Sequence, residues 1–391
     1  MDKEYLRVRV GKTSAYVRKC CLNKLKGADA AIFDCDGVLI DTRESYQKCV
    51  VETVKYFVRE VTDINPPPDE VLREAIHRLK KSGGFNNDWD TAYAILLFLF
   101  NKAPTDFQDE FISLTRSKEF QEKKLRARLD YVKVSLKSRP SSFTTGLGEL
   151  ASELLQFTAR ADDSGIRSIE RELNSSEEML LATKSFLNYP DSVKESPLAI
   201  VFDEIFYGPE LFENTHGRAR QFYNGSGFVE REREQTLVTC EIIDELAQVI
   251  GRENFGIVSG RDRLSARFSL GCILDKFVKE SMIFLMDHNY MDEKTEDRGK
   301  LRKPDPYPLI KASKGLEPFN YSLYVGDSAE DMIMAKRANE IDSRFVSVGV
   351  YSLSDFKQEL ISYFFKMNTD VIIYSIKGLP SLLRKIKVKE I

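Results

Sequence analysis

Residues 30–38 read Ala-Ala-Ile-Phe-Asp-Cys-Asp-Gly-Val, a short apolar run that ends at two closely spaced carboxylates. A run that is short, continuous and apolar is typical of a buried strand in a parallel sheet. Ligands of open α/β sheets bind beyond the carboxyl ends of the strands. We therefore expect Asp34 and Asp36 to lie at a functional site.

Asp34 and Asp36 are separated by one residue, and two carboxylates this close repel each other unless a positive charge joins them. A divalent cation that prefers oxygen ligands, such as Mg²⁺, is the simplest solution. The main alternative for this pattern is an EF-hand calcium loop, which needs a glycine at position six and a distal glutamate. Gly37 stands at position four and is followed by Val38 and Leu39, so an EF-hand is excluded. The remaining alternative is an acidic turn without a function.

Further short apolar runs predict the rest of the sheet, and they cover residues 255–258, 323–325, 345–350 and 371–373. Helical periodicity follows most of these runs. A repeated strand–helix pattern predicts the α/β class, with a Rossmann-like parallel sheet as the core.

A long segment between the first two predicted strands has mostly helical periodicity, including a densely charged stretch over 116–137 that we predict as one helix. We therefore expect a core made of residues 28–42 plus 233–391, with a large all-helical cap domain inserted over 43–232. In residues 1–27, polar and apolar side chains alternate on both sides of a predicted turn at Gly11-Lys12. This pattern predicts an N-terminal extension that contains a hairpin.

Bulk composition narrows the function class. The 391 residues include 58 basic and 61 acidic side chains, giving a formal net charge of −3, so no positive excess favours a nucleic-acid partner. No apolar segment is long enough to span a membrane, and the first residues do not resemble a signal peptide. We expect a soluble cytoplasmic protein. The sequence leaves the oligomeric state open, and a homodimer is compatible with it.

Cysteine and histidine usage limits the chemistry. The six cysteines form no C-x-x-C pair and no cluster with zinc-like spacing, which is typical of reduced cysteines in a cytoplasmic protein. With three histidines in the chain, Ser-His-Asp and Cys-His mechanisms are disfavoured. Carboxylates are therefore the expected acid–base groups.

The pattern Asp34-x-Asp36-Gly37-Val38-x-x-Asp41-Thr42 closely resembles the first motif of the haloacid dehalogenase superfamily. Three further signatures follow in that family's order: Ser259 at a predicted strand end, Lys303 in Arg302-Lys303-Pro304-Asp305-Pro306, and Gly326-Asp327-Ser328-Ala329-Glu330-Asp331. Any one of these occurs often by chance, but the four together are specific because their strand contexts also agree. The resemblance covers 28–42 and roughly 233–391.

The resemblance implies a role for each matched residue. Asp34 would be the nucleophile that forms an aspartyl-phosphate, and Asp36 would be the general acid and base. Mg²⁺ would be bound by the carboxylates of Asp34 and Asp327 and by the backbone carbonyl of Asp36, with Asp331 acting through water or orienting the ligands. Lys303 would neutralise Asp34 and the phosphate, and Ser259 would donate a hydrogen bond to the phosphoryl group.

Each of these residues also has a simpler interpretation. Lys303 could be a solvated loop lysine, Ser259 a turn serine, and Asp331 the N-cap of a helix. Gly260 and Arg261 are placed at the substrate phosphate, although for Arg261 a surface salt bridge is an equal alternative.

The resemblance also limits the reaction. Superfamily members that act on carbon–halogen or carbon–phosphorus bonds lack an aspartate at the position of Asp36, so its presence implies phosphate-ester chemistry. Hydrolysis of a small phosphorylated metabolite is the first expectation, and a phosphomutase is the alternative because mutases share the same core. A non-catalytic binding module is the third, and it would be expected to have eroded motifs.

One segment of the predicted cap has a distinctive composition. Residues 81–90 contain paired glycines, the single tryptophan Trp89, and a polar cluster that includes Asn87 and Asp88, and an apolar helix follows. We predict that Asn87 and Asp88 bind substrate, because free N–H groups at a helix start favour anionic ligands. The alternative is a helix-capping turn in which Trp89 fills the core.

Overall fold

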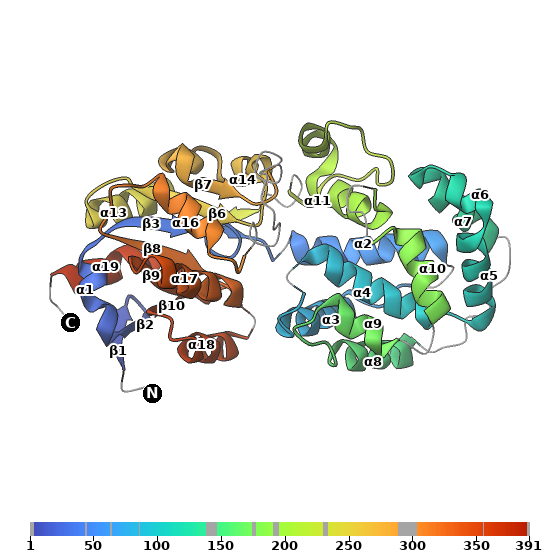
Figure 1. Cartoon of the computed structure of the whole chain (residues 1–391), viewed down its shortest axis with the longest axis horizontal. Helices are drawn as coiled ribbons and strands as arrows, with labels where there is room; N and C mark the ends of the chain where they lie inside the picture. The colour runs from blue at the N-terminus through green and yellow to red at the C-terminus, as the bar shows by residue number, and fades with distance from the viewer. Residues whose placement is uncertain are drawn as a thin grey trace. The chain divides into compact units, whose positions relative to one another are not determined.

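The computed structural model describes residues 4–43, 45–62, 65–85, 87–137, 147–173, 177–190, 195–229, 234–287, 303–354 and 356–388. Contacts between Cα atoms divide the chain into two compact units (Figure 1). Unit 1 contains Met1–Thr42 and Glu234–Ile391, and unit 2 contains Arg43–Arg233.

Unit 1 is built on an eight-stranded sheet that confirms the predicted α/β class. In spatial order its strands are β1 (Tyr5–Val10), β2 (Thr13–Arg18), β10 (Val371–Ile373), β9 (Phe345–Val350), β8 (Tyr321–Gly326), β3 (Ala28–Phe33), β6 (Phe255–Ser259) and β7 (Met282–Phe284). The strands from β10 to β7 are all parallel. Every apolar run predicted as a strand is a strand of this sheet, whereas β7, with three residues, was not predicted.

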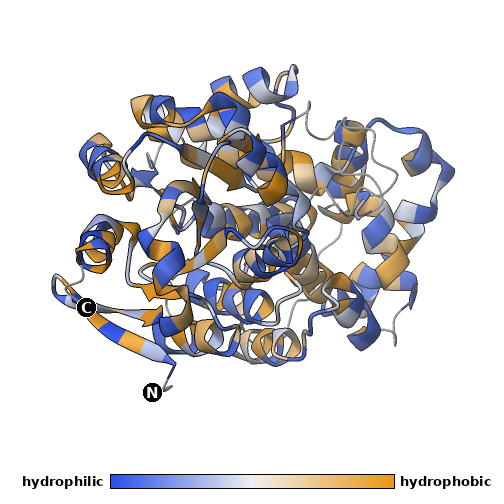
Figure 2. Cartoon of the chain, turned by 60° about the vertical axis from the view of Figure 1, so that its left-hand side comes forward, coloured by the Kyte–Doolittle hydropathy of each residue, from blue (hydrophilic) through white to orange (hydrophobic). Residues whose placement is uncertain are grey.

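Helices cover both faces of the parallel strands. Along β3, Ala31 and Phe33 face a core that includes α1 (Leu22–Lys26), α13 (Cys240–Ile250), α14 (Arg263–Leu270) and α19 (Leu379–Lys387). Ala30 and Ile32 face the opposite core, with α16 (Tyr307–Lys314) and α17 (Ala329–Ile341). Burial on both faces explains why the strands are continuously apolar rather than alternating. In Figure 2 the helices carry hydrophilic and hydrophobic residues in alternation along their length, as amphipathic helices do.

Two small elements complete the strand topology. β1 and β2 form an antiparallel hairpin, and β2 extends the sheet by pairing antiparallel with β10. A separate two-stranded sheet joins β4 (Ile40–Asp41) to β5 (Gln235–Thr236). This pairing brings the segment that follows unit 2 back beside the segment that follows β3. A further helix of unit 1, α18 (Lys357–Lys366), packs Phe364 against Ile372 of β10.

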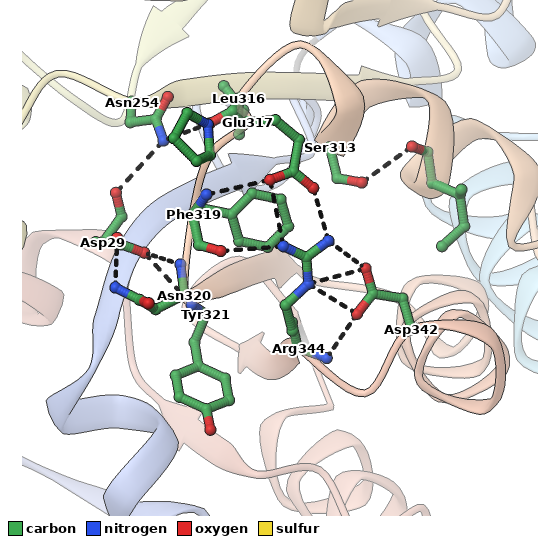
Figure 3. A network of polar contacts seen from close by, with 12 residues as sticks. Asp29, Asn254, Ser313, Leu316, Glu317, Phe319, Asn320, Tyr321, Asp342 and Arg344 are labelled. Carbon is green, nitrogen blue, oxygen red and sulfur yellow. Dashed lines mark hydrogen bonds and ion pairs between the residues drawn. The ribbon is translucent and has the colours of Figure 1, made fainter.

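The amino ends of the central strands are held by a polar network (Figure 3). Arg344, directly before β9, donates to Asp342 at 2.7 Å and to Glu317 at 2.7 Å, and its guanidinium lies 4.0 Å from the ring centre of Phe319. Asp29 in β3 accepts from the backbone of Asn320 at 2.8 Å and from Arg252 at 3.0 Å. These contacts tie the starts of three strands together.

The described part of unit 2 contains helices and no strand. They are α2 (Tyr46–Val61), α3 (Asp69–Lys81), α4 (Asp88–Asn101), α5 (Thr105–Arg116), α6 (Lys118–Glu122), α7 (Leu125–Lys137), α8 (Leu147–Thr158), α9 (Ile166–Glu172), α10 (Glu177–Leu187) and α11 (Pro197–His216). Residues 92–100 of α4 are all buried, which places this helix in the centre of the unit's core. The single helix predicted over 116–137 is wrong, because Lys123 has an extended backbone and separates α6 from α7. Ser117 separates α6 from α5, and its hydroxyl caps α6 by accepting from the N–H of Phe120.

Candidate active site

Three neighbouring strands of unit 1 end at the same edge of the sheet, and a polar residue lies at or just after each end. Phe33 of β3 lies opposite Val325 of β8 and Ile257 of β6. Asp34 therefore follows β3 between its two neighbours, and its N–H donates to the carbonyl of Val325 at 2.9 Å. Asp327 follows β8, and Ser259 is the last residue of β6. The topology brings together residues that lie far apart in the sequence.

Lys303 lies between two carboxylates at this edge. Its Nζ is 2.9 Å from Oδ2 of Asp34 and 2.8 Å from Oδ1 of Asp331. The side chain of Lys303 is 9% exposed, so the alternative of a solvated loop lysine is wrong. Burial alone would lower the pKa of Lys303, but Asp331 and Asp34 raise it well above its ordinary value, so the side chain is charged.

Asp331 is fully buried, and both of its carboxylate oxygens are used by neighbours. Oδ1 accepts from Lys303 and from the hydroxyl of Tyr324 at 2.6 Å, and Oδ2 accepts from the N–H and the hydroxyl of Ser328 at 3.1 and 2.6 Å. Burial would raise the pKa of Asp331, but Lys303, Ser328 and Tyr324 together hold it below its ordinary value. A carboxylate has about four lone-pair positions, and these four contacts occupy them.

Asp331 is not the N-cap of α17, which was the simpler interpretation of this residue. The N-cap of α17 is Ser328, and Asp331 is the third residue of a reciprocal capping box with it. Tyr324, which donates to Asp331 from within β8, was not identified in the sequence. It lies in an apolar strand, where a buried tyrosine is usually core, and only the structure shows its hydroxyl aimed at a carboxylate.

Asp34 and Asp327 have raised pKa values, in contrast to Asp331. Burial raises the pKa of Asp34 to about 7 despite the opposing effect of Lys303, with Asp331 and Asp36 adding to the rise. Burial also raises the pKa of Asp327 well above its ordinary value, and the charges of Asp331 and Asp34 contribute. Among the described residues, Asp327 has no hydrogen bond or ion pair to balance its charge.

A metal ion fits this set of donors. Oxygen atoms of Asp34, Asp327 and Asp331 all lie within 4.8 Å of one another. Because the oxygens of Asp331 already accept four hydrogen bonds, Asp34 and Asp327 are the carboxylates that can contact a cation directly. Gly37 has a φ of +75°, and a Cβ at this position would lie 1.8 Å from Oδ2 of Asp327. The backbone that follows Asp36 is therefore close to Asp327. Carboxylate and carbonyl oxygens are the ligands that Mg²⁺ and Ca²⁺ prefer.

Asp36 is held by a buried arginine. Nε of Arg261 donates to Oδ1 of Asp36 at 2.9 Å, and its two terminal nitrogens donate to both oxygens of Glu234 at 2.6 and 2.8 Å. Burial raises the pKa of Asp36 to about 6, and Arg261 opposes that rise. Arg261 is 1% exposed, so the surface salt bridge considered for it is wrong. Glu234 was not predicted from the sequence, because it stands at the end of a run of alternating glutamates and arginines that is typical of an exposed segment.

Ser259 and Gly260 lie beside this group but differ in exposure. Ser259 is fully buried, and its hydroxyl accepts from the N–H of Arg261 at 3.3 Å, as a turn serine does. Gly260 is exposed, and a Cβ there would meet nothing within 4 Å. Asp262 caps α14 by accepting from Ser265, which fixes the end of this loop. The roles of Ser259 and Gly260 toward phosphate remain predictions.

Asn87 and Asp88 lie in unit 2, where their contacts are local. Asn87 is the N-cap of α4 and accepts from the N–H of Trp89 at 2.9 Å, and Asp88 pairs with Lys80 at 2.8 Å. Trp89 packs against the unit's core and donates to Asp203 at 3.2 Å. Asn87 therefore caps the helix, as the alternative interpretation predicted. Substrate binding by Asn87 and Asp88 remains a prediction.

Comparisons with known proteins support the fold. No protein-family model matches the chain, and no curated protein matches it by sequence. Its backbone is similar to the X-ray structure of a Northeast Structural Genomics Consortium target, with a TM-score of 0.63, 17% identity, and coverage of 92% of this chain and 99% of that chain. A more distant likeness is to phosphatase Tt82 from Thermococcus thioreducens, with a TM-score of 0.47, 18% identity, and coverage of 85% and 98%. The first likeness shows the fold alone, and the second TM-score is too low to carry an argument.

No helix in the described ranges combines the length and the apolar character that crossing a bilayer requires.

Proposed function

We propose that this chain is a Mg²⁺-dependent phosphatase that hydrolyses small phosphate monoesters through an aspartyl-phosphate on Asp34. The observation that carries the proposal is the position of Asp34, which lies at a strand end, 2.9 Å from Lys303, within a cluster of carboxylates that can hold a cation. The ordered motifs that resemble the haloacid dehalogenase superfamily support the same reaction. A non-catalytic binding module would not require these charged side chains, whose removal from water is unfavourable.

The carboxylates of Asp34 and Asp327 and the backbone carbonyl of Asp36 would hold the metal. Asp331 would act outside this set, because its oxygens already accept from Lys303, Tyr324 and Ser328. When bound, Mg²⁺ supplies positive charge that offsets the carboxylates and the phosphate, so that an anionic substrate can approach an anionic nucleophile.

The first half-reaction is phosphoryl transfer to the protein. A carboxylate oxygen of Asp34 forms a bond to phosphorus while the bond from phosphorus to the ester oxygen breaks. The electron pair of the broken bond goes to the ester oxygen, which takes a proton from Asp36 and leaves as an alcohol. Lys303 contributes a fixed positive charge beside Asp34.

The second half-reaction returns the protein to its starting state. Asp36, now a carboxylate, takes a proton from water as the water oxygen attacks the phosphorus of the aspartyl-phosphate. The bond between that phosphorus and Asp34 breaks, and inorganic phosphate is released. The side chain of Asp36 is 28% exposed, which is compatible with access for water.

The test is phosphate release from p-nitrophenyl phosphate by the full-length chain. Chelation should abolish the release, Mg²⁺ should restore it, and Ca²⁺ should not, because the larger ion takes a looser and higher-coordinate shell. Acid quenching during turnover should trap one labelled phosphate on Asp34, and hydroxylamine should release it. Full activity after thorough chelation would contradict the proposal. With sugar phosphates, a mutase would produce an isomerised ester without inorganic phosphate, whereas a hydrolase would release phosphate.

A further inference from the structure

Arg261 is among the largest side chains that are fully buried in the described part of the chain, and its guanidinium has carboxylates on two sides. On one side Nε donates to Oδ1 of Asp36 at 2.9 Å. On the other side the two terminal nitrogens form a bidentate pair with Glu234 at 2.6 and 2.8 Å. The planar fork of arginine suits such a pair, whereas lysine would bind as a point charge.

Glu234 reaches this position through backbone pairing. It directly precedes β5, and β5 pairs with β4, where Ile40 lies opposite Thr236. Leu237 also donates to the carbonyl of Leu39 at 2.7 Å, which continues the pairing. The Glu234 side chain is 1% exposed, and Oε2 also accepts from Ser269 of α14 at 2.7 Å. The position of the Glu234 carboxylate is therefore fixed both by the backbone pairing of the neighbouring β5 and by Ser269, in addition to its contact with Arg261.

A buried charge network of this kind is not explained by stability alone. Removing charges from water costs about as much as their attraction returns, and apolar residues of similar volume are often equally good or better. A position that needed only packing could be filled by such residues. The presence of both charges beside Asp36 favours a role in the chemistry of that carboxylate.

We propose that Arg261 and Glu234 are positioning residues that orient Asp36 for proton transfer to the leaving group. Arg261 holds Asp36 by Oδ1, and Glu234 holds Arg261, so that Oδ2 of Asp36 is kept for the transferred proton. Among the described residues, no other side chain hydrogen-bonds to the Asp36 carboxylate. The inference rests on the proposed phosphatase function and assigns Arg261 to Asp36 rather than to the substrate phosphate. Arg261 and Glu234 exchange no proton in the reaction.

The experiment compares two phosphate esters whose leaving groups differ. Departure of an alkyl alcohol needs a proton from Asp36, whereas p-nitrophenolate departs without one. In Glu234→Gln, kcat/KM for an alkyl phosphate should fall about 100-fold, whereas kcat/KM for p-nitrophenyl phosphate should change by less than about threefold. Asp36→Asn is the reference and should show the same selective loss. A purely structural role for Glu234 would lower both values together.

Two further variants control for folding. Asp342→Asn breaks an arginine–carboxylate pair that is more exposed and lies at the amino ends of the strands, and it should leave the ratio of the two kcat/KM values unchanged. Glu234→Gln leaves a buried arginine short of one partner, which endangers folding. The double variant Arg261→Met with Glu234→Leu removes both charges, should fold, and should show the same selective loss for the alkyl ester.

The outcomes separate the two proposals. If the wild-type chain releases phosphate from neither ester with Mg²⁺ present, the proposed function fails and this inference falls with it. In a second case, the wild type and Asp36→Asn behave as described, but the folded Glu234→Gln and double variants show no selective loss for the alkyl ester. Either both esters are then affected equally or neither is affected, and only the positioning role is overturned. A selective loss in both variants supports it.

Discussion

The two ends of the central strands in unit 1 carry charge in different ways. At the amino ends, Glu317 and Asp342 share Arg344, as Figure 3 shows. Asp29 at the same ends pairs with Arg252. Hydrogen bonds from Arg344 lower the pKa values of Glu317 and Asp342. At the carboxyl ends, burial raises the pKa values of Asp34 and Asp327 instead.

This difference separates a structural network from a candidate site. Each carboxylate of the amino-end network has an arginine partner, whereas Asp327 at the carboxyl ends has no hydrogen bond or ion pair among the described residues. Four changes test the contrast, and two of them have a control variant near the opposite end of the same strand.

The largest effect is expected for Asp34→Asn, which keeps the shape of the side chain but removes the nucleophile. Phosphate release should fall at least a thousandfold, equivalent to about 4 kcal/mol in the barrier. Asp29→Asn at the opposite end of β3 should leave kcat/KM within about twofold, because it lies outside the chemistry. Steady-state kinetics on folded variants measures both, and a loss within about tenfold for Asp34→Asn would remove it from the mechanism.

Magnesium should stabilise unit 1 by binding to the folded state. At a concentration of about 100 times Kd, the free energy of unfolding should rise by about 2.7 kcal/mol. In Asp327→Asn this response should disappear, and the metal-free variant should be no less stable than the wild type because a crowded carboxylate is gone. Thermal unfolding with and without Mg²⁺ measures the effect. An undiminished magnesium response in Asp327→Asn would place the metal elsewhere.

Arg344→Ala should affect stability and leave catalysis alone. It removes a network with two carboxylates and a cation–π contact with Phe319, so we expect a loss of about 1–2 kcal/mol. Urea unfolding measures this loss, and kcat/KM at a temperature where the variant is folded should match the wild type. If activity fell by more than the unfolded fraction explains, the two ends of the sheet would be coupled and the contrast between them would fail.

The smallest effect is expected for Tyr324→Phe, which removes a single hydroxyl from β8. Asp331 keeps Lys303 and Ser328 but loses one donor, so stability should fall by about 1 kcal/mol and kcat by a few-fold. Tyr321→Phe, at the first residue of the same strand, is the matched control and should change neither quantity. Equal behaviour of the two variants would show that the Tyr324 hydroxyl is not needed to orient Asp331.

Prediction from sequence succeeded where the signal is local. The run that ends at Asp34 and the later apolar runs around residues 255–258 and 323–325 predicted the central strands, because burial on both faces leaves a continuous apolar pattern. It failed for β7, which has three residues, and for the predicted helix over 116–137, where Lys123 interrupts the helix without a glycine or proline to signal the break.

The identities of Asp34, Asp36, Lys303, Asp327 and Asp331 as candidate residues could be taken from short motifs, since each motif is a property of a few consecutive residues. Their contacts could not be, because hydrogen bonds between distant segments depend on how strands and helices pack. Tertiary packing places Glu234 against Arg261 and buries Arg261 against Asp36. It also gives both carboxylate oxygens of Asp331 hydrogen-bond donors from the protein itself. The sequence determines which charged residues are present, and the tertiary structure determines which of them are paired. The reason is that burial and distance determine the strength of an electrostatic interaction, and neither is a local property of the chain.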